Sequence, residues 1–334
     1  MDVDHTIVEL LDRWYDVRGA ALRPLRCLRD RCVYRVERAD GPNWVLRAFR
    51  WESVAAENQA QAAALLYLQD AGYPACRLVP ARGGALVVEH AGWQALATTF
   101  LEGREADFST GDLHALGAAL GRLHRLDVGA ARRGDPPVQP SEWRAGGAAA
   151  DLLGRLRAAT DRVPAHLAEQ FADAVAALVR VEPAPGLPDA LIHTDCFPGN
   201  AFWVDGDTLA LADWDGAGIG PAILDLATTL ISCDKGLPRE PQLRPSAGRI
   251  AAIVAGYCRE RPLAPADLAA LPDALRYAPA VRGAWCLAET IDGNDMLVHY
   301  RRWRARYDVA DEVAEIVRAK LTTDDCLPKE EDRR

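Results

Sequence analysis

The segment LIHTDCFPGN, residues 191–200, contains a histidine, an aspartate and an asparagine around a Pro-Gly pair. Its apolar start, Leu191-Ile192, predicts the end of a short buried strand, and Pro198-Gly199 predicts a tight turn. The oxygen-bearing side chains of Asp195 and Asn200 would then stand on a loop at the end of a strand. A polar turn fits the same residues, with Asp195 capping a helix and Asn200 in a left-handed conformation.

The residues after Asn200 predict a β-hairpin that leads to a second acidic loop. Residues 201–204 and 209–212 have strand character, with an Asp-Gly turn between them. The second strand runs into Asp213-Trp214-Asp215 and a glycine-rich turn. Because a hairpin returns the end of its second strand to the start of its first, we expect Asp213 near Asp195 and Asn200. Such oxygen donors suit Mg²⁺, which needs few protein ligands when substrate phosphates supply the rest.

Taken in order, these motifs resemble the kinase pattern, in which a catalytic-loop Asp and Asn precede a metal-binding Asp. The HxDxxxxN loop, DWD in place of DFG, and the following GPxxxDLA are more closely similar to the aminoglycoside phosphotransferase family. That family includes choline-kinase-like, homoserine-kinase-like and macrolide-phosphotransferase-like enzymes. FLEGR (100–104) resembles its interlobe hinge, LGAALGRLH a helix behind the catalytic loop, and VLRAFR the strand with its phosphate-contacting cation.

The resemblance implies an α+β fold, a protein-kinase-like arrangement of two lobes with ATP in the cleft between them. Residues 1–104 would form the nucleotide-binding lobe, a small antiparallel sheet with one helix and the hinge. Residues 105–334 would form a larger, mainly helical lobe for catalysis and acceptor binding.

In the catalytic lobe the resemblance implies a role for each motif residue. Asp195 would be the base that orients the acceptor hydroxyl, and Asn200 and Asp213 would hold Mg²⁺ between the ATP phosphates. His193 would keep the loop rigid, and Asp225 would accept hydrogen bonds from catalytic-loop amides.

In the nucleotide-binding lobe the resemblance implies Arg47 as the cation on the phosphates, and Phe100 and Leu101 as hinge contacts to the nucleotide. The helix acid that pairs with Arg47 is ambiguous. Gln61 stands at the expected site and Glu57 one turn earlier, and we favour Glu57.

The sequence also departs from the family pattern. Thr194 replaces the usual glycine between His and Asp, and Phe197 replaces the usual histidine two residues after the base. Arg47 replaces a lysine, so a planar fork stands in for a point charge. The loop over the phosphates, residues 28–31, has no glycine, which limits how closely its backbone can approach phosphate. Asp215 is undecided between a supporting role and a substrate contact.

Periodicity and turn signals predict the elements that position these residues. Strands are expected at 22–28, 32–38, 43–50, 84–90 and 95–103, helices at 5–16, 52–71, 112–126, 147–160, 164–180, 265–290 and 309–320, and an exposed loop at 127–142.

Composition narrows the class of protein. The 334 residues carry a net charge of −9, which does not favour a nucleic-acid-binding surface. The acidic N-terminal segment lacks the features of a signal peptide, and no apolar run is long enough to span a membrane. The eight cysteines contain no CxxC pair and are expected to be reduced and mostly buried. We expect a cytoplasmic protein, a monomer or homodimer, without membrane or nucleic-acid partners.

The sequence therefore predicts ATP- and Mg²⁺-dependent phosphorylation of a hydroxyl on a small molecule. The acceptor is an antibiotic, such as an aminoglycoside or macrolide, or a metabolite, such as homoserine, choline or a sugar. Two alternatives are a protein kinase of the bacterial stress-response type and a catalytically inactive nucleotide-binding protein. Acceptor recognition is expected after residue 235, and candidate contacts in or beside that region are Asp234, Trp285, Glu289 and Asp292.

Overall fold

The protein is described by a computed structural model in which the chain forms two compact units. The described residues are 3–28, 31–50, 55–143, 147–181, 186–234 and 245–323. Unit 1 comprises residues 1–104, 129–139 and 202–218, and unit 2 comprises residues 105–128, 140–201 and 219–334. The assignment of nucleotide binding to residues 1–104 and of catalysis to residues 105–334 remains a prediction.

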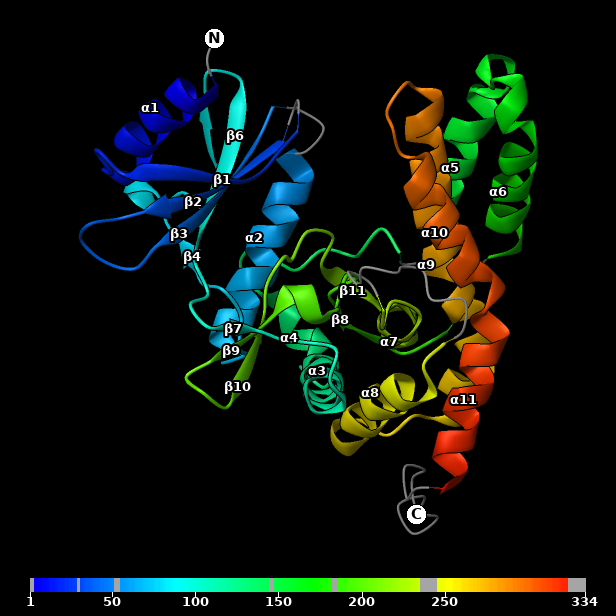
Figure 1. The fold of residues 1–334 in the computed structure, drawn as a ribbon. Coiled ribbons are helices and arrows are strands. Elements are labelled where there is room, and N and C mark those ends of the chain that lie inside the picture. Colours follow the sequence, from blue (N-terminus) through cyan, green and yellow to red (C-terminus); the bar gives the residue numbers. More distant parts are fainter. Residues whose placement is uncertain are drawn as a thin grey trace. The chain divides into compact units, whose positions relative to one another are not determined.

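Unit 1 is built on an antiparallel sheet (Figure 1). The strands follow the order β1-β2-β3-β6-β4, and β5 also pairs with β6. Their bounds are β1 (Ala21–Leu28), β2 (Arg31–Glu37), β3 (Trp44–Phe49), β4 (Leu78–Val79), β5 (Val88–His90) and β6 (Trp93–Thr99). Each predicted strand overlaps one of these, whereas β4 was not predicted because two residues show no alternation.

Successive side chains of β3 point to opposite faces of the sheet in unit 1 and pack against different parts of the molecule. Leu46 and Ala48 are buried in a core that includes Ile7 and Leu10 of α1 (Val3–Tyr15). Side chains alternate along a strand, so Arg47 points to the opposite face. The helix α2 (Ala55–Asp70) contacts β4 and β6.

The predicted hairpin is present. The strands β9 (Ala201–Val204) and β10 (Thr208–Leu211) pair, and β9 also pairs with β7 (Arg104–Glu105). The exposed loop expected at 127–142 is partly wrong, because the short helix α4 (Val128–Arg133) forms there with Ala131 fully buried. Six residues are too few to show helical periodicity, so packing rather than pattern stabilises this helix.

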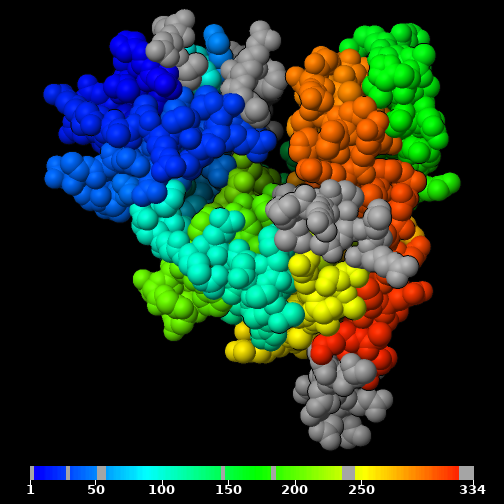
Figure 2. Space-filling model, viewed as in Figure 1, coloured from blue at the N-terminus to red at the C-terminus, as the bar shows by residue number. Residues whose placement is uncertain are grey.

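Unit 2 is mainly helical, with the short strands β8 and β11 paired. The helices α5 and α6 lie beside α9, which also packs on α10; α5 and α6 are green and α10 is orange in Figures 1 and 2. The bounds are α3 (Thr110–Leu123), α5 (Gly147–Ala158), α6 (Ala168–Arg180), β8 (Asp189–Ile192), β11 (Gly218–Pro221), α7 (Ala222–Ile231), α8 (Ala247–Glu260), α9 (Pro265–Ile291), α10 (Leu297–Asp308) and α11 (Ala310–Thr323).

The helices α3 and α8 approach closely because glycines line their contact. A Cβ atom on Gly117 would lie 2.1 Å from the Ile253 carbonyl oxygen, and one on Gly256 would lie 1.9 Å from the His114 carbonyl oxygen. The LGAALG segment is therefore a helix-packing motif. None of the helices in the described parts of the chain combines the length and apolarity that a bilayer crossing requires.

Candidate active site

The predicted catalytic loop follows β8 in unit 2 and is held by a buried carboxylate. The backbone N–H groups of His193 and Thr194 donate to the two oxygens of Asp225, at 2.6 and 2.8 Å. Asp225 is fully buried in the first turn of α7. A carboxylate that accepts two backbone hydrogen bonds fixes the direction in which the chain leaves the strand.

Thr194 has φ +70°, in the left-handed region that glycine enters without steric cost. The left-handed conformation costs a residue with a Cβ atom roughly 1–2 kcal/mol, and residues with β-branched side chains adopt it especially rarely. This conformation gives a physical reason for the glycine that the family pattern places at this position. In this chain, Thr194 adopts the same backbone shape with its polar backbone atoms engaged by side chains.

Asp195 and Asn200 contact each other at the end of this loop. Asn200 Nδ2 donates to the Asp195 carbonyl oxygen at 2.9 Å and lies 3.4 Å from Asp195 Oδ2. The Asp195 amide donates to His193 Nδ1 at 3.3 Å. The Asp195 side chain is 22% exposed, so its carboxylate is held by the loop and still reaches solvent.

A buried chain of polar side chains continues from Asp225. His124 Nε2 lies 3.1 Å from Asp225 Oδ2, His124 Nδ1 lies 2.8 Å from the Tyr257 hydroxyl, and Arg261 donates to that hydroxyl at 2.8 Å. Burial lowers the pKa of His124 although Asp225 opposes the shift, so the imidazole is neutral. We infer that Nε2–H donates to Asp225 and that Nδ1 accepts from Tyr257, because Asp225 can only accept.

Cys196 follows Asp195 in this loop. Its side chain is buried, and burial raises the pKa of its thiol. Because the thiolate is the reactive form, a buried thiol with a raised pKa is poorly suited to act as a nucleophile.

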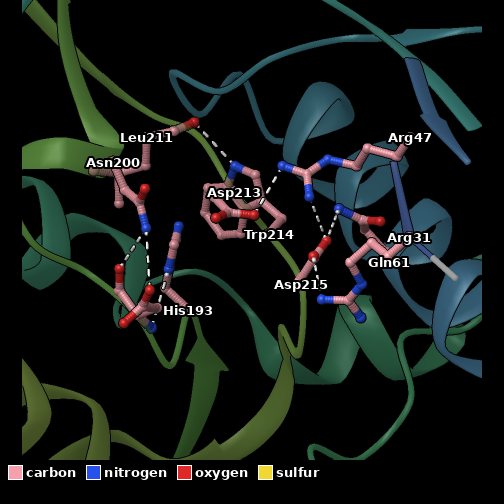
Figure 3. Close-up of polar contacts among 10 residues, drawn as sticks. Arg31, Arg47, Gln61, His193, Asn200, Leu211, Asp213, Trp214 and Asp215 are labelled. Carbon is pink, nitrogen blue, oxygen red and sulfur yellow. Dashed lines mark hydrogen bonds and ion pairs between the residues drawn. The ribbon is translucent and has the colours of Figure 1, made fainter. Parts of the chain in front are cut away.

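Unit 1 contains a second polar group, the acid–arginine cluster, formed by Arg47, Gln61, Asp213 and Asp215 (Figure 3). Arg47 Nη2 donates to Asp213 Oδ1 at 2.8 Å, and Arg47 Nη1 donates to Asp215 Oδ1 at 2.9 Å. Gln61 Nε2 also donates to Asp215 Oδ1, at 2.9 Å. The planar guanidinium thus bridges two carboxylates of the segment that follows β10.

The backbone of this segment is anchored by Trp214. Its indole N–H donates to the Leu211 carbonyl oxygen at 2.9 Å, and its ring is buried edge-on against Tyr73. Asp213, on one side, has φ +63°. The anchored tryptophan leaves the two flanking carboxylates directed at Arg47.

The pKa shifts in this cluster follow from burial and charge. Burial disfavours the charged form of Arg47, but the carboxylates of Asp215 and Asp213 outweigh it and raise the pKa of Arg47. Burial raises the pKa of Asp215, while Arg47 opposes the shift and Asp213 adds to it. The two aspartates are therefore close enough to repel each other when Arg47 is engaged elsewhere.

The partner of Arg47 on α2 is only partly described. The side chain of Glu57 lies outside the described side chains, so the preference for Glu57 stays a prediction. Gln61 is buried and reaches the cluster through Asp215.

The residues predicted as the hinge, Phe100 and Leu101, follow β6 in unit 1. The Phe100 amide donates to the Asn43 carbonyl oxygen at 2.9 Å, and the Arg35 guanidinium lies 4.2 Å from the centre of the Phe100 ring. Leu101 is half-buried. The contact of Phe100 and Leu101 with a nucleotide remains a prediction.

The four residues predicted to contact the acceptor differ in whether their side chains form ion pairs within the protein. Arg155 binds Glu289 at 2.8 Å and Asp292 at 2.7 Å, and the hydrogen bonds that Asp292 accepts from Arg155 and Arg162 lower its pKa. Asp234 pairs with Arg306 at 3.1 Å. Trp285 is 45% exposed on α9. Three of the four candidates are thus engaged in ion pairs within unit 2.

The donor chemistry of Asn200 and Asp213 fits a hard divalent cation. Asn200 directs its Nδ2 at Asp195, and its Oδ1 has no partner among the described residues. Asp213 uses Oδ1 for Arg47, and its Oδ2 has no partner within the described ranges. No cluster of three or more His, Cys, Asp or Glu side chains in the described part of the chain could hold a metal.

Comparison with known families gives this geometry a context. The model of the phosphotransferase enzyme family matches residues 22–271. The chain belongs to this family. A homoserine kinase of Caulobacter sp. (strain K31) is 33% identical over 218 residues, 64% of each chain. A homoserine kinase of Xanthobacter autotrophicus is 33% identical over 201 residues, covering 60% of this chain and 59% of that one. The chain thus matches less than two thirds of the length of these relatives.

Solved structures show that the fold of this phosphotransferase-family member is kinase-like. An amicoumacin kinase, solved in complex with AMP-PNP, Ca²⁺ and Ami, has a TM-score of 0.67 at 18% identity, covering 92% of this chain and 93% of that one. The predicted α+β, protein-kinase-like fold class is confirmed, with the antiparallel sheet in unit 1 and most helices in unit 2.

The sequence did not predict several residues that contact the loop or the side chains that hold it. Arg282 of α9 contacts the loop, flanked by Trp143 and Trp303, and Tyr257 of α8 reaches His124. One signal for Arg282 was present, since an arginine inside the apolar run YAPAVRGAWCLA requires a partner. Nothing local to these residues indicates which partner that is.

Proposed function

We propose that the chain is an ATP- and Mg²⁺-dependent phosphotransferase that phosphorylates a hydroxyl of a small molecule. The observation that carries this proposal is the way the loop after β8 is held. Asp225 fixes its backbone through two amides, and the loop presents the Asp195 carboxylate with Asn200 beside it. A helix-capping role would not need this buried support.

In the proposed reaction Asp195 accepts the proton of the acceptor hydroxyl and directs its oxygen at the terminal phosphate. Arg47 would contact the ATP phosphates, and Asn200 and Asp213 would hold Mg²⁺ through the oxygens Oδ1 and Oδ2. Mg²⁺, when bound, supplies positive charge that offsets the charge of the phosphates. Phe100 and Leu101 would contact the nucleotide.

Homoserine is the first acceptor to test, because the curated relatives at 33% identity are homoserine kinases. Amicoumacin is the second, because a kinase for it shares the fold. The expected cytoplasmic location and the monomeric or homodimeric state remain predictions.

The test measures ADP release from ATP in the presence of homoserine, choline, aminoglycosides, macrolides and amicoumacin, with and without a chelator. One acceptor is expected to stimulate ADP release, and the chelator is expected to abolish it, as is Asp213→Ala in a folded variant. Full activity in excess chelator would contradict the metal requirement. Transfer to a generic protein with no small acceptor would favour the protein-kinase alternative.

A further inference from the structure

Arg282 lies in the middle of α9 and contacts the residue that we propose as the base. Its Nη2 donates to the Thr194 carbonyl oxygen at 2.9 Å and lies 3.2 Å from Asp195 Oδ1. One guanidinium nitrogen therefore joins the backbone before Asp195 to the carboxylate of Asp195. All of these residues belong to unit 2.

Two tryptophans hold the guanidinium in place. It lies 5.7 Å from the centre of the Trp143 ring and 5.4 Å from the centre of the Trp303 ring. Trp143 precedes α5 and Trp303 belongs to α10, and both side chains are buried. Cation–π contacts from two other segments restrict the rotamers of a side chain that is otherwise flexible.

Thr194 shows why such a contact is useful. Its left-handed backbone is costly, and its N–H is already taken by Asp225 on α7. Arg282 takes its carbonyl oxygen, so both polar backbone atoms of the residue before Asp195 are bound by side chains of other helices. The carboxylate of Asp195 then has one oxygen paired with a rigid cation.

We propose that Arg282 is a positioning residue for the Asp195 carboxylate, held rigid by Trp143 and Trp303. The proposal rests on the proposed function, since it assigns Arg282 a role in the action of Asp195 as base. A misplacement of a reacting group by about 1 Å can cost about 10²-fold in rate. Loss of Arg282 is therefore expected to lower kcat more than it changes either KM.

Two other roles for Arg282 give different results. A residue that only stabilises α9 would affect thermal stability and leave kcat of the folded protein unchanged. A residue that binds the acceptor would raise the KM for the acceptor and leave kcat of the saturated enzyme unchanged.

The experiment compares Arg282→Met and Arg282→Lys with the matched control Arg276→Met. Arg276 lies on the same helix, donates to the Pro272 carbonyl oxygen and pairs with Asp311, so the control removes similar contacts elsewhere. Each variant is assayed for kcat and for both KM values with ATP and homoserine, or the acceptor that the panel identifies. Amide hydrogen exchange of the peptide 191–200 is measured on the same samples.

Arg282→Met is expected to lower kcat about 10²-fold, with both KM values within about threefold. Arg282→Lys should retain part of the activity, and added guanidinium should restore part of it to Arg282→Met. Exchange of the peptide 191–200 should increase in Arg282→Met and stay unchanged in Arg276→Met. An unchanged kcat, a loss confined to the acceptor KM, or an equal loss in Arg276→Met would overturn the proposal.

A further variant and the exchange readout cover two other outcomes. If Arg282→Met does not fold, Arg282→Gln keeps a polar side chain without the charge and is judged by the same criteria. If the wild-type protein turns over no acceptor, the proposed function fails, while hydrogen exchange still tests the positioning role. Unchanged exchange in the Arg282 variant would overturn that role by itself.

Discussion

The two polar groups of this protein differ in how far they are removed from water. In unit 2 the side chains of Asp225 and His124 are 0% exposed. In unit 1 the carboxylates of Asp213 and Asp215 are 42% and 31% exposed, although they share Arg47. The first group binds backbone amides and neutral side chains, and the second consists mainly of opposite charges.

Under the proposed function, the buried group in unit 2 has a structural role, and the more exposed cluster in unit 1 has a binding role. A buried carboxylate that loses its partners is left desolvated, so the Asp225 group is costly to break and holds one geometry. Charges that reach solvent contribute less and can exchange partners. The proposed function requires the acid–arginine cluster to release its carboxylates and guanidinium to a metal and phosphates, while the loop in unit 2 keeps its shape.

The largest expected effect is on Asp195, the residue that the buried group supports. Asp195→Asn keeps the shape but cannot accept the proton, so kcat should fall by roughly 10²–10⁴-fold. Asn caps a helix about as well as Asp, so a capping residue would leave turnover unchanged. ATP affinity and thermal stability, measured on the same purified variant, should change little. Turnover within about threefold of wild type would refute the kinase interpretation of the loop.

Asp225→Asn should show the opposite pattern, with stability lost first. The amide places an NH₂ group against N–H donors of His193, Thr194 or His124, and a buried donor left without an acceptor costs about 1–3 kcal/mol. Urea unfolding measures this loss. A decrease below about 1 kcal/mol would mean that the buried group does not hold the loop as strongly as its burial indicates.

Arg47→Ala tests the acid–arginine cluster and should change nucleotide use more than stability. The KM for ATP should rise about tenfold, as expected for one lost charge-assisted contact. Arg47→Lys should retain part of this function, since the charge remains and the fork is lost. Steady-state kinetics with varied ATP measures both variants. Unchanged kcat and KM in Arg47→Ala would show that Arg47 does not contact the phosphates.

The smallest expected effect is a pH dependence from His124. Burial lowers the pKa of His124 in the folded state, so below pH about 6.5 the unfolded chain binds a proton that the folded protein excludes. The free energy of unfolding should therefore fall as the pH falls, by up to about 1.4 kcal/mol per pH unit from this residue. Urea unfolding at pH 7.5 and 5.5 should show a weaker dependence in His124→Gln. Equal dependence in both proteins would contradict a neutral His124.

Sequence reasoning predicted the parts of the fold and site that depend on neighbouring residues. The hairpin β9–β10 was predicted from its Asp-Gly turn and is present. The run 43–50 was predicted as a strand that carries Arg47, and β3 (Trp44–Phe49) forms there. Two-residue strands and the short helix α4 were missed because their patterns are too short to have a period.

Contacts between distant segments could not be predicted in the same way. His124 has the sequence context of an ordinary helix residue, yet it bonds to Asp225, 101 residues later. Its second contact, with Tyr257 of α8, depends on the close approach of α3 and α8, which the glycines permit. Arg47 binds Asp213 and Asp215, 166 and 168 residues later.

The sequence by itself determined the order and chemical type of the motif residues, because a loop, a turn and a hairpin are specified by residues that are adjacent in the chain. Only the tertiary structure decided which side chains support them. Arg282 reaches Thr194 across 88 residues of chain, between two tryptophans from separate segments. Such a contact depends on how helices pack, and packing is set by the shape of the whole core rather than by any local pattern.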